Sequence, residues 1–213
     1  MEAKVQALPL FPLNVVLFPG QSLPLHIFEP RYRAMITHCL NNNEPFGVVL
    51  AYEPDTPVEV GTTARVTEVK RLPDGRMDIV TVGEERFKIH NLRQSPEGYL
   101  IGDVTLFPFT GTPDKSLVAE VARRTRRYVK LLADANGMRL RFDQFPNDAN
   151  DLALFAAIAL RLPLDEKQEL LDKDTLVSLM QAEARTLGVE NRLMSITTAA
   201  IRPPEDEHGF CRN

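Results

Sequence analysis

Proline and glycine are concentrated in the first half of this sequence. Twelve of its sixteen prolines and eight of its eleven glycines precede Asp114. Both residues are unfavourable inside helices and favourable in turns, so they limit the first half to short extended segments joined by turns. The second half carries few such breaks and is free to form helices. We therefore expect the architecture to change close to residue 113.

Six segments of the first half have the alternation or the β-branched and aromatic content of strands. Glycine-containing segments at 73–76, 83–85 and 95–98 predict the turns between the later strands. Short strands at this spacing favour a small sandwich or a closed barrel. The predicted strands cover residues 22–27, 46–52, 62–72, 77–82, 86–92 and 99–107.

One helix is expected to interrupt the strands. It begins at Pro30, where a missing amide hydrogen costs nothing in a first turn, and it ends at the asparagines 41–43. Its apolar residues recur every three or four positions, so they form one stripe that faces the sheet. Cys39 lies on that stripe and is expected to be a small core residue.

Helical periodicity dominates from Asp114 onwards. Asp114 is placed to cap the first of these helices, and Asp174 to cap a later helix that Gly188 ends. Asp165 and Gln168 have the spacing of a capping box. The predicted helices cover residues 114–136, 151–160, 165–171, 174–188 and 190–201.

These patterns predict an α+β fold of two lobes. Residues 1–113 form a β-rich lobe with one inserted helix, residues 114–201 form a helical bundle, and residues 202–213 form a polar tail.

Composition and charge exclude several classes of protein. A formal net charge of -4 and an isoelectric point of about 5.6 supply no field that attracts phosphate, which disfavours nucleic acid as a partner. The longest apolar run, residues 152–160, is too short to cross a membrane, and early prolines interrupt any signal-peptide core. Two cysteines without a CxxC motif indicate a reducing compartment, so we expect a cytoplasmic protein.

Motifs of common catalytic sites do not occur in the sequence. It contains no GxxxxGK[ST], GxGxxG or GxSxG segment, and its four histidines are scattered. His26 is expected to be solvated or hydrogen-bonded, and His208 with Cys211 supplies only two metal ligands in a polar tail. We predict that the chain is not an enzyme and has no catalytic residues, metal or cofactor.

Two aromatic residues are candidates for binding. Phe107 and Phe109 flank Pro108 between the two predicted lobes. Junctions between lobes are common places for grooves that accept a ligand or an extended chain. The same rings are equally suited to hold the lobes together.

A basic stripe is the second candidate. Arg123, Arg127 and Lys130 fall on one face of the predicted helix, where they could hold phosphate or an acidic partner. The alternative is a solvated face whose cations complement the negative end of the helix dipole.

Two consecutive segments carry a family resemblance. Residues 8–20 have the sequence LPLFPLNVVLFPG, and LPLHIFEPRY follows at residues 23–32. This motif closely resembles the opening of the amino-terminal, substrate-binding domain of the Lon family of ATP-dependent proteases. Asp74-Gly75, Gly83 and the RFKI segment from Arg86 resemble that domain's hairpin and next strand. The segments at 151–160 and 167–171 resemble its helical lobe, so the likeness covers almost the whole chain.

The resemblance implies a PUA-like β-barrel joined to a helical bundle, in a domain that engages substrate polypeptides for degradation. The sequence stops where a Lon protease would continue into its ATPase and peptidase modules, so we expect a free-standing member. The prolines and the glycine of the motif are expected to fix backbone angles. Glu29 and Arg31 are expected to form an ion pair at the start of the helix.

Three functions remain open at this stage. The first is a non-catalytic module that binds unfolded or partner polypeptides through apolar surface near the lobe junction. The second is an adaptor that docks on one folded partner. The third is a hydrolase or an RNA-binding module on a PUA-like barrel, since one fold hosts many functions.

Overall fold

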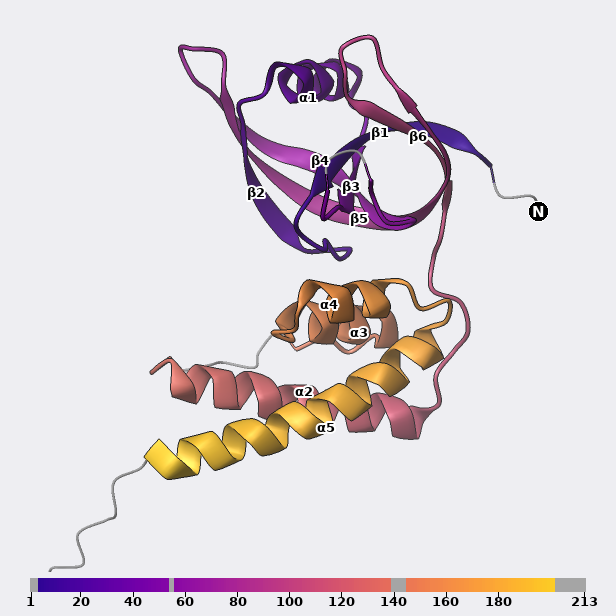
Figure 1. The fold of residues 1–213 in the computed structure, drawn as a ribbon. Coiled ribbons are helices and arrows are strands. Elements are labelled where there is room, and N and C mark those ends of the chain that lie inside the picture. Colours follow the sequence, from indigo (N-terminus) through magenta and orange to yellow (C-terminus); the bar gives the residue numbers. More distant parts are fainter. Residues whose placement is uncertain (1–3, 54–55, 139–144, 202–213) are drawn as a thin grey trace, which may run out of the picture.

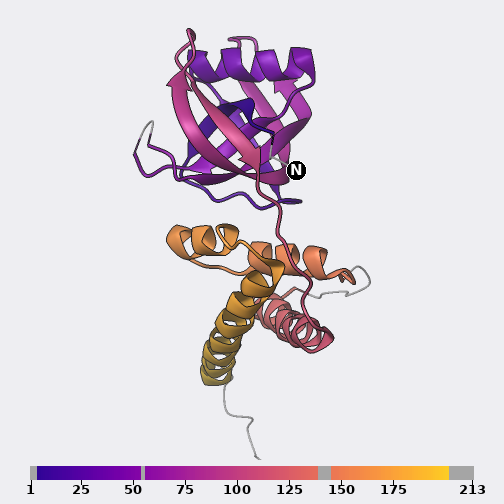
Figure 2. The ribbon, with the colours of Figure 1, turned by 90° about the vertical axis from the view of Figure 1, so that its right-hand side faces the viewer.

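The computed structural model describes residues 4–53, 56–138 and 145–201. A six-stranded sheet comes first, helices follow it, and one helix lies between the strands. Figures 1 and 2 show the sheet above and the later helices below. The strands are β1 (Gln6–Leu13), β2 (Ser22–Ile27), β3 (Phe46–Leu50), β4 (Val60–Arg71), β5 (Met77–Gln94) and β6 (Leu100–Leu106). The helices are α1 (Pro30–Asn42), α2 (Lys115–Ala135), α3 (Ala149–Ala159), α4 (Leu164–Leu171) and α5 (Leu176–Ile201).

Strand pairing forms a closed circuit. β1 pairs with β3 in parallel and with β6 antiparallel. The pairs β3–β4, β4–β5 and β5–β6 are antiparallel, so the circuit returns to β1. β2 lies outside the circuit and, within the described residues, pairs with β5 alone. The mixed fold of strands followed by helices is the one that the sequence predicts.

The sequence patterns miss β1, because Pro9 and Pro12 lie inside it. β6 pairs with residues 6–10 of this strand and β3 with residues 10–13. Each proline therefore has a paired neighbour on one side only. The position where its N–H is missing can face the unpaired side, so no ladder hydrogen bond is lost.

The predicted turn at residues 83–85 is wrong, because β5 runs unbroken through these positions. A Cβ on Gly83 would lie 2.4 Å from the carbonyl oxygen of Phe18. The Gly20 N–H donates to the Gly83 carbonyl at 2.8 Å, and the Gly83 N–H donates to Gln21 at 3.0 Å. Glycine is thus needed here for a close backbone approach by the loop before β2.

The predicted capping box at Asp165 is also wrong. α4 begins after Pro163 without a side-chain cap. The Gln168 side chain donates instead to the carbonyl of Val60 at 3.0 Å and to Asp172 at 2.7 Å. A residue expected to cap its own helix therefore ties that helix to the start of β4.

The two helices predicted between residues 174 and 201 are one helix, α5. Its first turn is capped by Thr175 rather than by Asp174, since the Thr175 hydroxyl accepts the Ser178 N–H at 3.0 Å. Gly188 does not end it. A Cβ at Gly188 would lie 2.5 Å from Nη1 of Arg124, so this glycine makes room for a side chain from α2.

Other local predictions are confirmed. The Asp114 carboxylate accepts the Leu117 N–H at 2.8 Å and caps α2. Glu29 and Arg31 form an ion pair of 3.0 Å at the start of α1. The turn at 73–76 joins β4 to β5, and the turn at 95–98 joins β5 to β6.

Sheet and helices share an apolar core. The cluster that contains the inner faces of α2, α3, α4 and α5 also contains Val16, Phe18, Leu50 and Val60 from the strand-rich part. A second cluster lies beneath α1. No helix in the described part of the chain has both the length and the apolar character needed to cross a membrane.

Arg86 of β5 lies at the junction between the sheet and the helices, with 2% of its surface exposed. Its Nη1 donates to the carbonyl of Lys173 at 2.9 Å and to that of Leu171. Its guanidinium carbon lies 4.6 Å from the ring centre of Phe107 and 3.3 Å from that of Phe109. Burial lowers the pKa of Arg86 to about 10, so the side chain stays charged at neutral pH.

Candidate functional site

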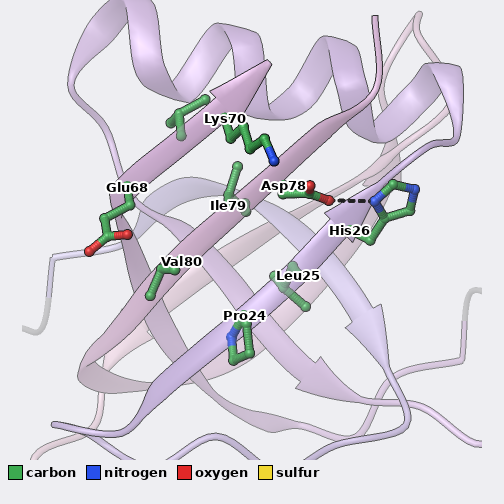
Figure 3. Close-up of a pocket in the computed structure, with 9 residues that line it drawn as sticks. Pro24, Leu25, His26, Glu68, Lys70, Asp78, Ile79 and Val80 are labelled. Atoms are coloured by element: carbon green, nitrogen blue, oxygen red, sulfur yellow. Dashed lines mark hydrogen bonds and ion pairs between the residues drawn. The ribbon is translucent and has the colours of Figure 1, made fainter. Parts of the chain in front are cut away.

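A hollow of about 550 Å³ lies on three neighbouring strands, β2, β5 and β4. We call it the strand hollow, and Figure 3 shows its side chains. Its volume falls within the usual range of ligand-binding pockets, ~300–1,000 Å³. The lining residues are Pro24, Leu25 and His26 of β2, Asp78, Ile79 and Val80 of β5, and Glu68, Val69 and Lys70 of β4.

A bulge in β4 shapes the strand hollow. Val66 pairs with Thr81 and Glu68 with Val80, which leaves Thr67 as an extra residue. The Thr67 hydroxyl donates to the carbonyl of Val80 at 3.1 Å and holds the bulge in place. Bulges bend a strand and increase its twist, so the three strands curve at this point.

Strand register arranges the side chains of the hollow in two cross-strand rows. Pro24 and Glu68 both pair with Val80, while His26 and Lys70 both pair with Asp78. One cross-strand row therefore has an apolar centre, and the next row carries three ionisable side chains. Figure 3 shows these rows side by side on the same three strands.

Two of the ionisable side chains in the hollow already contact each other. His26 Nδ1 lies 2.6 Å from Asp78 Oδ1. The side chains of Glu68 and Lys70 are exposed and make no hydrogen bond or ion pair with another described residue. One cation and one anion are therefore available to polar groups of a ligand, and the hollow favours neither sign of charge.

An exposed aromatic ring extends the hollow. Phe28 follows β2 and is 60% exposed. Its ring stacks on that of His26, with centroids 6.1 Å apart and planes 22° apart. Aromatic side chains are enriched in the cores of protein interfaces, so this exposed ring beside the hollow is a candidate contact for a partner.

The strand hollow also borders unpaired backbone. β2 pairs with β5 alone, and residues 65–71 of β4 pair only with β5, among the residues described. Such strands present free N–H and C=O groups on their outer side. An added strand can use these groups while its side chains enter an adjacent pocket.

The two aromatic candidates from the sequence lie elsewhere. Phe107 and Phe109 are half-buried and pack on the core shared by sheet and helices. Together they hold the guanidinium of Arg86. A smaller hollow of about 160 Å³ includes Phe109 and Pro108 in its lining.

Arg123, Arg127 and Lys130 are all exposed on α2, as the basic stripe requires. Arg123 and Arg127 line another hollow, between α2 and α5, and Lys130 does not. Arg127 Nη2 donates to the Ser195 hydroxyl at 3.1 Å.

Cys39 and His26 are placed as the sequence predicts. Cys39 is buried, and desolvation raises the pKa of its thiol to about 11. His26 is hydrogen-bonded to Asp78. Within the ranges that the structure covers, no group of three or more His, Cys, Asp or Glu side chains is arranged to hold a metal. His208 and Cys211 lie outside the described residues.

Sequence reasoning did not find the strand hollow. Its local signal is the alternation in β2 of Pro24 and His26 with the core-facing leucines. The rest of the hollow depends on the pairing of β2 with β5, which joins residues fifty or more positions apart. That register is not encoded in any single segment.

The sheet, the helices that follow it and an open hollow on edge strands define a mixed α/β protein with a surface suited to binding. Residues 7–184 match the model of the ATP-dependent protease La (LON) substrate-binding domain. The chain belongs to this family.

Similar proteins include Lon proteases and cereblon. The Lon protease of Buchnera aphidicola is 26% identical over 219 residues, which cover 94% of this chain and 28% of the relative. Protein cereblon of Danio rerio is 33% identical over 122 residues, which cover 53% of this chain and 28% of cereblon. The match thus spans little more than a quarter of either relative.

Solved structures show the same fold. The Lon N-terminal domain protein from Xanthomonas campestris superposes with a TM-score of 0.66 at 23% identity, covering 93% of this chain and 99% of that one. The N-terminal domain of the Mycobacterium avium complex Lon protease gives a TM-score of 0.68 at 18% identity, covering 86% of this chain and 98% of that one.

Proposed function

We propose that this protein binds polypeptides in an extended conformation in the strand hollow, without transforming them chemically. The observation that carries the proposal is an open hollow with an apolar centre beside strands with free backbone groups. The two arrangements act together, because the backbone of a peptide pairs with an edge strand while its side chains enter a pocket.

The chemistry of the hollow supports a polypeptide of no fixed sequence. Its apolar centre rewards burial of any apolar side chain. The free side chains of Glu68 and Lys70 accept either sign of charge, and neither dominates. Membership of a family described as a substrate-binding domain agrees with this chemistry.

Fluorescence anisotropy with a reduced and alkylated, permanently unfolded model protein tests the proposal. We expect binding with a micromolar Kd. Phe28→Ala should raise that Kd about tenfold, since an exposed aromatic anchor contributes most of the energy at such surfaces. Because Phe28 is 60% exposed, its loss leaves the fold intact.

The matched control is Tyr52→Ala, which removes a ring of similar exposure, 64%, from outside the hollow. Its Kd should stay within about twofold of that of the unchanged protein. Equal weakening in both variants, or no complex at tens of micromolar protein, would refute the proposal.

We propose the lobe junction, with Phe107 and Phe109, as a second place where polypeptides bind. The hollow of about 160 Å³ next to Phe109 supports it. The same titration separates the two places: full binding by Phe28→Ala with loss in Phe109→Leu would move the site to the junction.

Finer features of the fold are also part of the proposal. We infer that the closed strand circuit is a PUA-like barrel and that the lobes divide at 113/114. The tail expected at residues 202–213 lies outside the described residues. A cytoplasmic location and substrates destined for degradation belong to the same inference. The matching Lon N-terminal domains support the part of this inference that concerns the fold.

A further inference from the structure

A second hollow, of about 260 Å³, lies between α2 and α5, which pack side by side (Figures 1 and 2). We call it the arginine pocket. Every ionisable residue that lines it is an arginine. The lining residues are Arg123, Arg124 and Arg127 of α2 and Gly188, Asn191 and Arg192 of α5.

Three of the four guanidinium groups are held in position. Arg124 donates to the carbonyl of Ala184. Arg127 donates to the Ser195 hydroxyl at 3.1 Å, and Arg192 donates to the carbonyl of Gly188 at 3.1 Å. Each of these bonds uses one of the five N–H groups of a guanidinium, so donors remain for a ligand.

The positive charge of the pocket is largely uncompensated. Arg124 Nη2 lies 2.5 Å from Glu120 Oε1. Arg123, Arg127 and Arg192 have no ion pair with any other residue that the structure describes. Like charges gathered around one hollow repel each other, and an anion between them relieves that repulsion. The local charge is opposite in sign to the net charge of the chain, -4.

Gly188 gives the pocket its shape. A Cβ added at Gly188 would lie only 2.5 Å from the Nη1 of Arg124. The glycine inside α5 therefore lets the guanidinium lie against the helix backbone. Asn191 also ties α5 to α2 at this point, since its side-chain amide donates to the backbone carbonyl of Arg124 at 3.0 Å.

We propose that the arginine pocket binds a compact, multiply charged phosphate of the pyrophosphate class. The planar donor fork of arginine matches the oxygens of a phosphoryl group. A volume of about 260 Å³ lies below the range typical of drug-sized ligands and suits one or two phosphoryl groups. This site is separate from the strand hollow and does not depend on polypeptide binding there.

Calorimetry with inorganic pyrophosphate at low salt is the test, and a rise in Tm with pyrophosphate is the second readout. Arg123→Ala with Arg127→Ala should weaken binding by at least about tenfold, because two charge-assisted donors are lost. Arg185→Ala, which removes an exposed arginine of α5 from outside the pocket, should leave the Kd within about twofold.

Gly188→Ala tests whether pyrophosphate binding depends on the shape of the pocket or only on its positive charge. The variant keeps every charge and favours the helix, but its new methyl group displaces Arg124. We expect weaker pyrophosphate binding, by at least about threefold, with an unchanged or higher Tm of the free protein. Binding equal to that of the unchanged protein would overturn the proposal of a built pocket.

Two further results would overturn it. One is no heat and no Tm shift with pyrophosphate at millimolar concentration. The other is tight, salt-dependent binding of single-stranded RNA that pyrophosphate does not displace, which would assign the arginines to a nucleic-acid surface. Displacement of phosphate-bearing ligands by pyrophosphate supports the pocket.

Discussion

Replacing Arg86 by alanine is expected to lower the free energy of unfolding by about 3–5 kcal/mol, as measured by urea denaturation. The change leaves a cavity between Phe107 and Phe109 and removes the donor from the carbonyls of Leu171 and Lys173. Leu171 ends α4 and Lys173 lies between α4 and α5, while Arg86 belongs to β5. The variant should therefore loosen the contact between sheet and helices.

Two substitutions control for this effect. Arg86→Met keeps most of the buried volume but no donor, so its cost should fall between zero and that of alanine. Arg65→Ala breaks an ion pair with Glu84 at the surface of the same sheet and should cost less than about 1 kcal/mol. A loss below about 1 kcal/mol in Arg86→Ala would contradict a role of Arg86 in joining sheet and helices.

Replacing Glu183 by methionine is expected to raise the free energy of unfolding by about 1–3 kcal/mol at pH 8. Glu183 lies on α5 with none of its surface exposed. Neither carboxylate oxygen has a hydrogen-bond partner among the described residues. Desolvation therefore raises the pKa of this carboxyl well above its usual value.

The gain in stability from Glu183→Met should be larger at high pH than at low pH. The pKa of Glu183 is higher in the folded state than in the unfolded chain. Between these two pKa values the folded state keeps a proton that the unfolded chain has lost. Stability is therefore greatest below the unfolded pKa, near 4.3, and falls as pH rises towards the folded pKa. The difference between Glu183→Met and the unchanged protein should shrink from pH 8 to pH 5.

Glu169→Met is the matched control, since Glu169 is exposed on the neighbouring helix α4. Its effect on unfolding should stay within about 0.5 kcal/mol at every pH. A destabilising Glu183→Met, or a gain that does not change with pH, would show that the carboxyl has a stabilising partner in the folded state.

Local chemistry predicted much of the fold. The cap at Asp114, the turn at 73–76 and the start of α1 at Pro30 depend on residues within a few positions of each other. Each is set by backbone angles or by a nearby side chain. Such features need no knowledge of the remaining chain.

The wrong predictions share a physical cause. Gly83 and Gly188 look like breaks, but each allows another segment to approach within 2.5 Å or less of the place of a Cβ. Gln168 looks like a cap, but its partner is the carbonyl of Val60. In all three cases the deciding contact comes from a distant part of the sequence.

The residues of the candidate sites also differ in whether the sequence alone could predict them. The basic residues Arg123 and Arg127 lie on one helical face and could be found from spacing alone. Their companion Arg192 comes from another helix, which only the packing of α2 on α5 brings near. The strand hollow needs the register of three strands and was not predictable.

The proline in the middle of β2 has a consequence for solubility in crowded solutions. An open strand edge invites a second copy to add its own strand, and repetition of that step gives polymers. Pro24 lacks an N–H, so two β2 strands cannot form a continuous ladder with each other. The edge can still receive a short guest segment, while fibre growth through repeated pairing of β2 strands is disfavoured.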